Sequence, residues 1–521
     1  MDPTRYPLIP WPRRLEPRDG WFLPSMFVVL IVPDGDDADV AWLATWLAGI
    51  FAPRGRFASV LPMPDYPPHT PGRDEVFLRL DRGGDYGGEE GYRLSVTPER
   101  VDLSAATVRG LWNAVQALDQ LVVRDGRGGR GIAIPAVEIE DAPRFGWRGM
   151  HLDVSRHFFP ISFIKKYIDL LAMYRFNTFH WHLTDDQGWR LQIRRYPRLT
   201  EVGAWRRETR IGHALAEPEL YDGTPHGGFY TQDEVRAVVE HARLRGVTVV
   251  PEIEMPGHSR AALAAYPELA CTPGPFEVAT SWRTQEDILC PGEATFEFLE
   301  NVLSEVMELF PSPYIHVGGD EAIKSRWRRS PVAQEVIRRE GLRDEMELQS
   351  WFIRRIERYL NAHGRRLVGW DEILEGGLAP NATVMAWRDV EHGIEAARQG
   401  HDVVMTPEFP VYFDHYQGDP AGEPLAIKGL TTLADVYAFE PVPPGLTPDE
   451  ARHVLGAQAN LWTEYVATPE HAEYMVLPRM LALAEVLWSP PESRDWASFQ
   501  ARLPAHLRRL GEMGYRFRAP G

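Results

Sequence analysis

The chain has 521 residues, of which 25% are charged and 44% belong to the hydrophobic set, as in an ordinary soluble globular protein. Its 74 acidic residues outnumber its 56 lysines and arginines, so the formal net charge is −18. This charge argues against nucleic acid or an anionic membrane as a partner, because both attract a basic surface. At about 150 residues per domain, the length suggests two to four domains.

No segment near the N-terminus predicts export or membrane insertion. The longest apolar run there, residues 26–32, is far shorter than the roughly 20 residues that span a bilayer. No basic stretch precedes an apolar one, as it would in a signal peptide, so we expect a cytoplasmic protein; a secreted protein whose leader has been removed would have the same sequence. The two cysteines, Cys271 and Cys290, could form one bridge or stay free thiols, and the sequence favours neither.

Residues 1–142 predict a small α+β domain. Four segments have the alternation of strands, and the last two flank the turn signal Thr97-Pro98-Glu99. These segments are residues 27–32, 76–80, 92–96 and 100–104. Residues 107–123 then carry apolar side chains at helical spacing. Such a unit would precede a second, larger domain.

Residues 143–521 predict a (β/α)8 TIM barrel with closing helices at its C-terminus. Eight short apolar segments alternate with longer helical patterns, as expected for βα units around a parallel sheet. The predicted strands are residues 150–155, 178–183, 247–254, 314–319, 366–370, 383–387, 402–406 and 453–462. The fold typically needs only ~250 residues, so long loops are expected at residues 190–230, 266–295 and 408–450. A strongly apolar helix at residues 471–488 should pack back on the barrel.

The chemistry of a barrel of this kind lies at the C-terminal ends of its strands. Carboxylates and aromatic residues recur there, the aromatic ones being Trp370, Trp387, Tyr412 and Trp462. A single tryptophan is usually a core residue, but four aromatic residues at successive strand ends favour a binding box. Aromatic faces ringed by acids and Arg156 suit a sugar, whose apolar faces stack while its hydroxyls bind charged groups.

A metal site would be the competing use of histidines at this rim. His180 and His182 alternate with Trp181, so both face one side of their strand, and a carboxylate could complete a site. However, no third histidine has ligand spacing and no H-E-x-x-H motif occurs. We therefore expect no metal and no cofactor. The other acids near the strand ends should support the site through hydrogen bonds and ion pairs, namely Asp153, Glu252, Glu254, Asp371 and Glu372.

The sharpest signal is the stretch Gly318-Gly319-Asp320-Glu321 at the end of the fourth predicted strand. Two glycines let another group approach the backbone closely, and two adjacent acids follow. An ordinary retaining glycosidase holds its acid and its nucleophile ~5–5.5 Å apart on opposite faces of the scissile bond. Consecutive residues cannot easily flank a sugar in that way. One acid can protonate the leaving oxygen, and the substrate itself can supply the nucleophile.

Eight ordered motifs resemble those of family-20 glycoside hydrolases, the β-N-acetylhexosaminidases. They are WRGMHLDVSRHF (147–158), FNTFHWHLTDDQGWR (176–190), HGGFYTQDEV (226–235), PEIEMPGH (251–258), HVGGDEA (316–322), VGWDEI (368–373), VYFD (411–414) and ANLWTEY (459–465). The resemblance covers the whole barrel. The preceding unit, which ends in GLWNAVQALDQL, resembles the accessory domain of the same family.

The resemblance implies a role for each matching residue. Glu321 is the expected general acid and base, Asp320 would orient the 2-acetamido group and stabilise an oxazolinium intermediate, and Tyr412 would hydrogen-bond the acetamido oxygen. Further expected contacts are Trp370, Trp387 and Trp462 around the sugar, Arg156, Asp414 and Glu464 on its hydroxyls, and Asp185 with His258 behind the acid. Repulsion from Asp320 should raise the pKa of Glu321.

The predicted function is that of an exo-acting retaining β-N-acetylhexosaminidase. It would release terminal non-reducing β-linked N-acetylglucosamine, with N-acetylgalactosamine as a second candidate, from small oligosaccharides or glycoconjugates. Three alternatives stay open: a retaining glycosidase with its own nucleophile, Glu372 or Glu464; a silent sugar-binding protein; and a metal-dependent hydrolase. The sequence predicts neither the linkage cleaved nor the oligomeric state.

Overall fold

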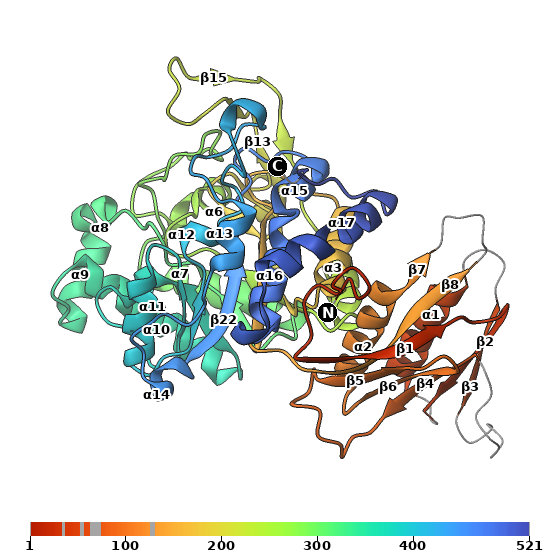
Figure 1. The fold of residues 1–521 in the computed structure, drawn as a ribbon. Helices are drawn as coiled ribbons and strands as arrows, with labels where there is room; N and C mark the ends of the chain where they lie inside the picture. Colours follow the sequence, from red (N-terminus) through yellow and green to blue (C-terminus); the bar gives the residue numbers. More distant parts are fainter. Residues whose placement is uncertain (1, 34–36, 53–56, 63–73, 125–130, 520–521) are drawn as a thin grey trace.

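An open sheet precedes a closed barrel in the computed structural model, which describes residues 2–33, 37–52, 57–62, 74–124 and 131–519 (Figure 1). This arrangement confirms the predicted (β/α)8 barrel behind a small α+β unit. None of the helices in these described ranges is both long enough and apolar enough to cross a membrane. The predicted domain boundary after residue 142 falls between β8 and β9 and stays a prediction.

The N-terminal sheet contains the four predicted strands and several more. Its order is β1 (Arg14–Phe22), β8 (Ile132–Asp141), β5 (Tyr92–Val96), β6 (Arg100–Ala105), β4 (Glu75–Leu80), β2 (Phe27–Val32) and β3 (Phe57–Pro62), with β7 (Val123–Arg124) paired to β8. Helices α1 (Ala38–Phe51) and α2 (Val108–Leu121) complete the unit. α2 packs against β5 and β6, and in Figure 1 it lies between the sheet and the barrel.

Buried polar groups join the sheet to the barrel. Asp141, the last residue of β8, accepts a hydrogen bond of 3.0 Å from the indole nitrogen of Trp488. The guanidinium of Arg175 lies 3.3 Å from the same carboxylate. Arg148, for which we expected a structural role, pairs with Glu90 at the N-terminal end of the first barrel strand. Fully buried groups of this kind need such partners, and these contacts hold the two parts together.

Eight parallel strands close the barrel, each paired with the next and the last with the first. In chain order they are β9 (Trp147–Asp153), β10 (Thr178–His182), β17 (Thr248–Glu252), β18 (Tyr314–His316), β19 (Arg366–Trp370), β20 (Thr383–Ala386), β21 (Val403–Met405) and β22 (Val454–Ala459). These are the eight predicted strands. Several bounds differ from the predicted ones: β9 begins at Trp147 instead of residue 150, β18 ends at His316 instead of residue 319, and β22 ends at Ala459, with an irregular segment up to Trp462.

Helices cover the barrel strands on the outside (Figure 1). The longer ones are α3 (Ile161–Met173), α5 (Gln232–Arg243), α7 (Glu293–Leu309), α9 (Pro331–Glu340), α10 (Glu345–Ala362), α11 (Val390–Arg398) and α17 (Trp496–Glu512). The prediction of one closing helix at residues 471–488 is wrong. Two helices, α15 (Pro469–Val476) and α16 (Arg479–Trp488), occupy it, because Pro478 lacks the N–H group that would continue the first.

The three predicted long loops carry short elements of their own. The first holds α4 (Arg198–Glu201) and two small hairpins, β13 (Trp205–Arg206) with β16 (His226–Gly227) and β14 (Arg210–Ile211) with β15 (Leu220–Tyr221). The second begins directly after α6 (Arg260–Ala265), contains the short 3-10 helix η2 (Pro267–Leu269) and ends slightly earlier than predicted, where α7 begins; a disulfide between Cys271 and Cys290 closes it. The third contains α12 (Glu408–Val411), α13 (Leu433–Ala438) and α14 (Pro448–Ala451).

Candidate active site

A cavity of about 280 Å³ opens at the C-terminal ends of the barrel strands. All the predicted site residues except Asp185 line it: Arg156, His258, Asp320, Glu321, Trp370, Trp387, Tyr412, Asp414, Trp462 and Glu464. Sequence reasoning missed four other lining residues, which are Glu408, His415, Ile427 and Lys428. A second cavity of about 320 Å³ lies between α2 and α5, but Asp39 is its sole carboxylate. Of these two cavities, the first is the one that combines several acids with an aromatic wall.

Four aromatic side chains form one wall of the cavity. Trp370 ends β19, and its ring centre lies 5.8 Å from that of Trp462. Trp387 and Tyr412 stack nearly parallel, with centres 6.2 Å apart. The indole nitrogen of Trp387 donates a hydrogen bond of 2.9 Å to Glu372. Because such hydrogen bonds fix the rings, the wall is set before a ligand binds.

The chain turns sharply where it delivers the two adjacent acids. Gly318 and Gly319 have φ angles of +66° and +95°, which favour glycine. A Cβ on Gly318 would lie 1.8 Å from a carboxylate oxygen of Glu254, so any other residue would force the turn or this carboxylate to move. Glu321 itself has a φ of +43°, in the left-handed region that side chains rarely adopt. Backbone strain of this kind is typical of functional sites.

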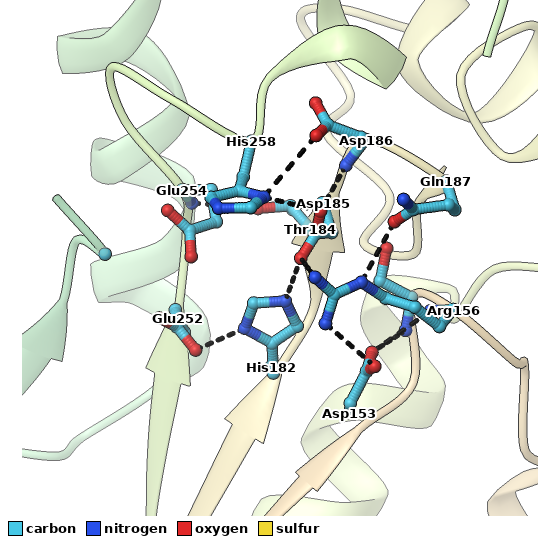
Figure 2. A network of polar contacts seen from close by, with 12 residues as sticks. Asp153, Arg156, His182, Thr184, Asp185, Asp186, Gln187, Glu252, Glu254 and His258 are labelled. Carbon is cyan, nitrogen blue, oxygen red and sulfur yellow. Dashed lines mark hydrogen bonds and ion pairs between the residues drawn. The ribbon is translucent and has the colours of Figure 1, made fainter. Parts of the chain in front are cut away.

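His258 binds both adjacent acids from one side. Its Nε2 atom lies 3.5 Å from Oδ2 of Asp320 and 3.4 Å from Oε2 of Glu321. On the other side of the ring, Nδ1 lies 3.0 Å from Oδ1 of Asp185 (Figure 2). His258 also has a left-handed backbone, with a φ of +45°. Asp185 thus stands behind His258, out of the cavity, while the two acids face the cavity together.

The pKa of Glu321 is lowered and that of Asp320 is raised, whereas we expected the pKa of Glu321 to be raised. Hydrogen bonding by His258 lowers the pKa of Glu321 in spite of burial, and Thr284 adds a further hydrogen bond. Burial, reinforced by the charges of Glu252 and Glu321, raises the pKa of Asp320 to about 6 although His258 opposes it. The prediction that Asp320 raises the pKa of Glu321 is therefore wrong for the free protein. That expectation considers only the neighbouring charge, although His258 is itself expected behind the acid.

Arg156 is held at the cavity edge by several polar groups (Figure 2). Its guanidinium lies 2.9 Å from Asp185 and 3.2 Å from Asp153, and it donates a hydrogen bond of 2.9 Å to Gln187. Glu464 is farther away, at 3.8 Å. These contacts hold a buried positive charge at the cavity, where Glu464 is the nearby carboxylate of the cavity wall. Such an arrangement can bind the hydroxyl groups of a sugar.

Asp414 is a buried carboxylate whose two oxygens have no hydrogen-bond partner among the described residues. Burial, together with the charge of Glu464, raises its pKa well above the usual range. Burial also raises the pKa of Glu464. Buried polar groups are nearly always hydrogen-bonded in folded proteins, so these groups are available to a polar ligand that enters the cavity.

The histidines of the metal hypothesis gather around Glu252, below the cavity. His182 contacts Glu252 through Nδ1, and His180 Nε2 lies 3.0 Å from the same carboxylate oxygen. With Glu252, His151 and His182 form one group and His180 and His316 form another, and within each group the ligand-type atoms lie within 4.8 Å of one another. However, the second nitrogen of His182 is hydrogen-bonded to Asp185 at 2.8 Å, so both of its nitrogens already face carboxylates. His182 therefore belongs to a hydrogen-bond network, and the absence of a metal stays a prediction.

Comparison with known proteins gives the same result for both parts of the chain. Residues 145–491 match the family model described as the catalytic domain of glycosyl hydrolase family 20, and residues 5–142 match that of its domain 2. A β-hexosaminidase of Porphyromonas gingivalis is 48% identical over 83% of this chain, which spans only 55% of that relative's length. A β-N-acetylhexosaminidase of Cellulomonas fimi is 34% identical over 98% of this chain and 96% of its own.

Among solved structures, the chain resembles a family-20 exo-β-N-acetylglucosaminidase of Vibrio harveyi in complex with N-acetylglucosamine. The TM-score is 0.84 at 32% identity, and the match covers 99% of this chain and 79% of the other. The similarity extends through the sheet unit and the barrel alike. The chain therefore belongs to glycosyl hydrolase family 20.

Proposed function

We propose that this protein is an exo-acting retaining β-N-acetylhexosaminidase that releases terminal non-reducing β-linked N-acetylglucosamine. The substrate's own acetamido oxygen would attack the anomeric carbon. The observation that carries this proposal is the common contact of Asp320 and Glu321 with one nitrogen, Nε2 of His258. Two acids held on one side cannot serve as the proton donor and the nucleophile on opposite faces of a sugar.

Each acid then has its own task. Glu321 would protonate the glycosidic oxygen and later remove a proton from the attacking water. Asp320 would hold the acetamido group in attack geometry and stabilise the positive charge of the oxazolinium ion. The side chain of Glu321 is 45% exposed in the free protein, so a bound sugar would bury it. Burial favours the protonated form, which the first step requires.

The remaining predicted residues would bind the sugar. Trp370, Trp387 and Trp462 would enclose its acetamido group and ring, and Tyr412 would hydrogen-bond the acetamido oxygen. Arg156, Asp414 and Glu464 would hold its hydroxyl groups, with Asp414 gaining the partner that it lacks in the free protein. Small oligosaccharides or glycoconjugates, including chitin fragments, are the proposed substrates. Binding of N-acetylgalactosamine depends on room at the 4-hydroxyl, which a panel of defined disaccharides would measure.

A thiazoline analogue of the oxazoline intermediate tests the substrate-assisted step. We expect inhibition at micromolar concentration or below, since such an analogue resembles the intermediate. Absence of inhibition at millimolar concentration would reject the mechanism. The alternative with an enzymic nucleophile makes the opposite prediction for a 2-fluoro sugar, which would then label Glu372 or Glu464. We expect no labelled peptide, since Glu372 is engaged by Trp387.

Two further comparisons separate the remaining alternatives. On an aryl N-acetylglucosaminide, Glu321→Gln should lower kcat by two orders of magnitude or more, about the contribution of general acid catalysis. A silent sugar-binding protein would show no activity in either form. A metal-dependent hydrolase would lose activity with a chelator, and we expect none to be lost.

The predicted cytoplasmic location stays a prediction. The disulfide between Cys271 and Cys290 argues against it, because disulfides persist mainly in oxidising compartments. Cell fractionation with thiol labelling of the recovered protein would decide between a cytoplasmic and an exported enzyme.

A further inference from the structure

Glu252 is a buried carboxylate at the centre of the barrel, below the cavity. It ends β17 and has no exposed surface. Its Oε1 atom accepts a hydrogen bond of 2.8 Å from the indole nitrogen of Trp370, and its Oε2 atom is hydrogen-bonded to Nδ1 of His182. Burial opposes its ionisation, but nearby histidines, His316 first, hold its pKa well below the usual range. The Glu252 carboxylate thus contacts two groups of residues beside the cavity: the aromatic wall and a chain of charged residues behind the acids.

The first of these structures is the aromatic wall. Trp370 is almost fully buried, and its ring packs 4.8 Å from that of His316 and 5.8 Å from that of Trp462. Within the described residues, the hydrogen bond to Glu252 is the only one that the Trp370 indole nitrogen makes. It sets the rotation of the ring about its side-chain bonds, which packing alone leaves less defined.

The second structure is the chain of alternating charges behind the acids (Figure 2). His182 lies between Glu252 and Asp185, with Nε2 at 2.8 Å from Oδ2 of Asp185. Since each ring nitrogen faces a carboxylate, both must carry hydrogen, and His182 is an imidazolium. Burial opposes this charge, but Glu252 and Asp185 raise the pKa of His182 to about 10. Asp185 in turn bonds His258, which reaches Glu321.

We propose that Glu252 is a positioning residue for both halves of the active site: one oxygen orients Trp370, and the other orients His258 behind Glu321 through His182 and Asp185. The inference rests on the proposed function and extends it to a residue that touches no substrate. It explains why an acid is retained at the barrel centre, where an uncompensated charge is costly. Loss of Glu252 should disturb sugar binding and proton donation together.

The test compares two aryl N-acetylglucosaminides whose leaving groups differ in their need for protonation: the 4-nitrophenyl and the phenyl compound. For Glu252→Gln we expect kcat/KM to fall by about 100-fold on the phenyl substrate and clearly less on the 4-nitrophenyl substrate, because a misplaced acid matters most for a poor leaving group. The thiazoline analogue should also bind more weakly, since Trp370 loses its partner.

His182→Gln separates the effect on His258 from the effect on Trp370, because it leaves the contact between Glu252 and Trp370 in place. It should show the same dependence on the leaving group while thiazoline binding stays near that of the wild type. Glu357→Gln is the matched control. Glu357 is another buried carboxylate, which accepts a hydrogen bond of 2.6 Å from the backbone of Asn381 away from the cavity. Its variant should affect both substrates by the same factor and leave thiazoline binding unchanged.

Equal losses on the two substrates with unchanged thiazoline binding in Glu252→Gln would overturn the proposal, because a purely structural role predicts that pattern. If circular dichroism shows Glu252→Gln to be unfolded, His182→Gln decides the question: a loss that does not depend on the leaving group rejects the inference. A wild-type protein that hydrolyses neither substrate would instead reject the proposed function. The two failures are therefore distinguishable.

Discussion

The Thr284 hydroxyl donates a hydrogen bond of 3.0 Å to Oε2 of Glu321. Thr284 comes from the loop between β17 and α7, whereas Glu321 follows β18, so neighbouring strands supply the two residues. The disulfide between Cys271 and Cys290 closes the same loop. In the proposed mechanism, this loop contributes directly to the environment of the proton donor.

Thr284→Val should therefore change the pH dependence of catalysis. After His258, Thr284 is a second side chain whose hydrogen bond lowers the pKa of Glu321. Removing a donor to the charged form raises the pKa, so the protonated acid persists to higher pH. We expect the basic limb of the kcat profile on the phenyl substrate, which reports the enzyme–substrate complex with Glu321 buried by the sugar, to move to higher pH. Thr284→Ser keeps the hydroxyl and should keep the wild-type limb; an unmoved limb in Thr284→Val would contradict the contact.

The disulfide should stabilise the folded protein by restricting the unfolded chain. It joins cysteines that are 19 residues apart, and closing a loop of this length contributes about 3 kcal/mol in the loop-entropy model. The chain has only two cysteines, so a reductant acts on this bond alone. We expect urea unfolding of the wild type to shift to lower urea in reductant, while the Cys271→Ser, Cys290→Ser double variant should not respond. A wild type insensitive to reduction would refute the stabilising role.

Much of the fold and of the cavity could be predicted, because both follow from the ends of consecutive strands. In a parallel barrel all C-terminal strand ends meet on one face, so Trp370, Trp387 and Trp462 converge although they are far apart in the sequence. Pro478 also indicates the break in the helix predicted at residues 471–488. The prediction of one helix missed it because the apolar pattern continues on both sides of the proline. The hydrophobic periodicity of a segment indicates which residues are buried more reliably than it indicates whether the helix is continuous.

The residues that could not be predicted lie on loops or depend on partners from other strands. Glu408 and Lys428 line the cavity because of the path that the loop at residues 408–450 takes, and spacing along the chain carries no information on that path. The same holds for Thr284 and for the influence of His258 on Glu321. Adjacency in the sequence indicates which charges are close, but a pKa depends on every neighbour in space.

The ionisation of Asp320 should produce an acid limb in the pH profile of the activity. It must be ionised to stabilise a cation, so activity should fall as the pH drops through its pKa of about 6, a value raised first by burial and further by the charges of Glu252 and Glu321. Glu321→Gln removes one of these charges, which lowers the pKa of Asp320. On the 4-nitrophenyl substrate, which needs little acid help, the acid limb of this variant should move to lower pH. A limb at the wild-type pH or above would contradict the assignment.

Gly318→Ala should impair both folding and catalysis. The φ of +66° alone disfavours alanine by roughly 1–2 kcal/mol, and the new Cβ would lie 1.8 Å from Oε2 of Glu254, so the turn or the carboxylate must move. Because Asp320 and Glu321 follow two and three residues later, we expect kcat to fall beyond what the lost stability explains. Gly511→Ala is the control: Gly511 lies in α17, its Cβ would meet nothing nearer than 3.7 Å, and alanine should be neutral or stabilising by up to about 1 kcal/mol. Urea unfolding and kcat, measured on both variants, check these two expectations. Wild-type values of both for Gly318→Ala would contradict the close packing of Glu254 against the turn.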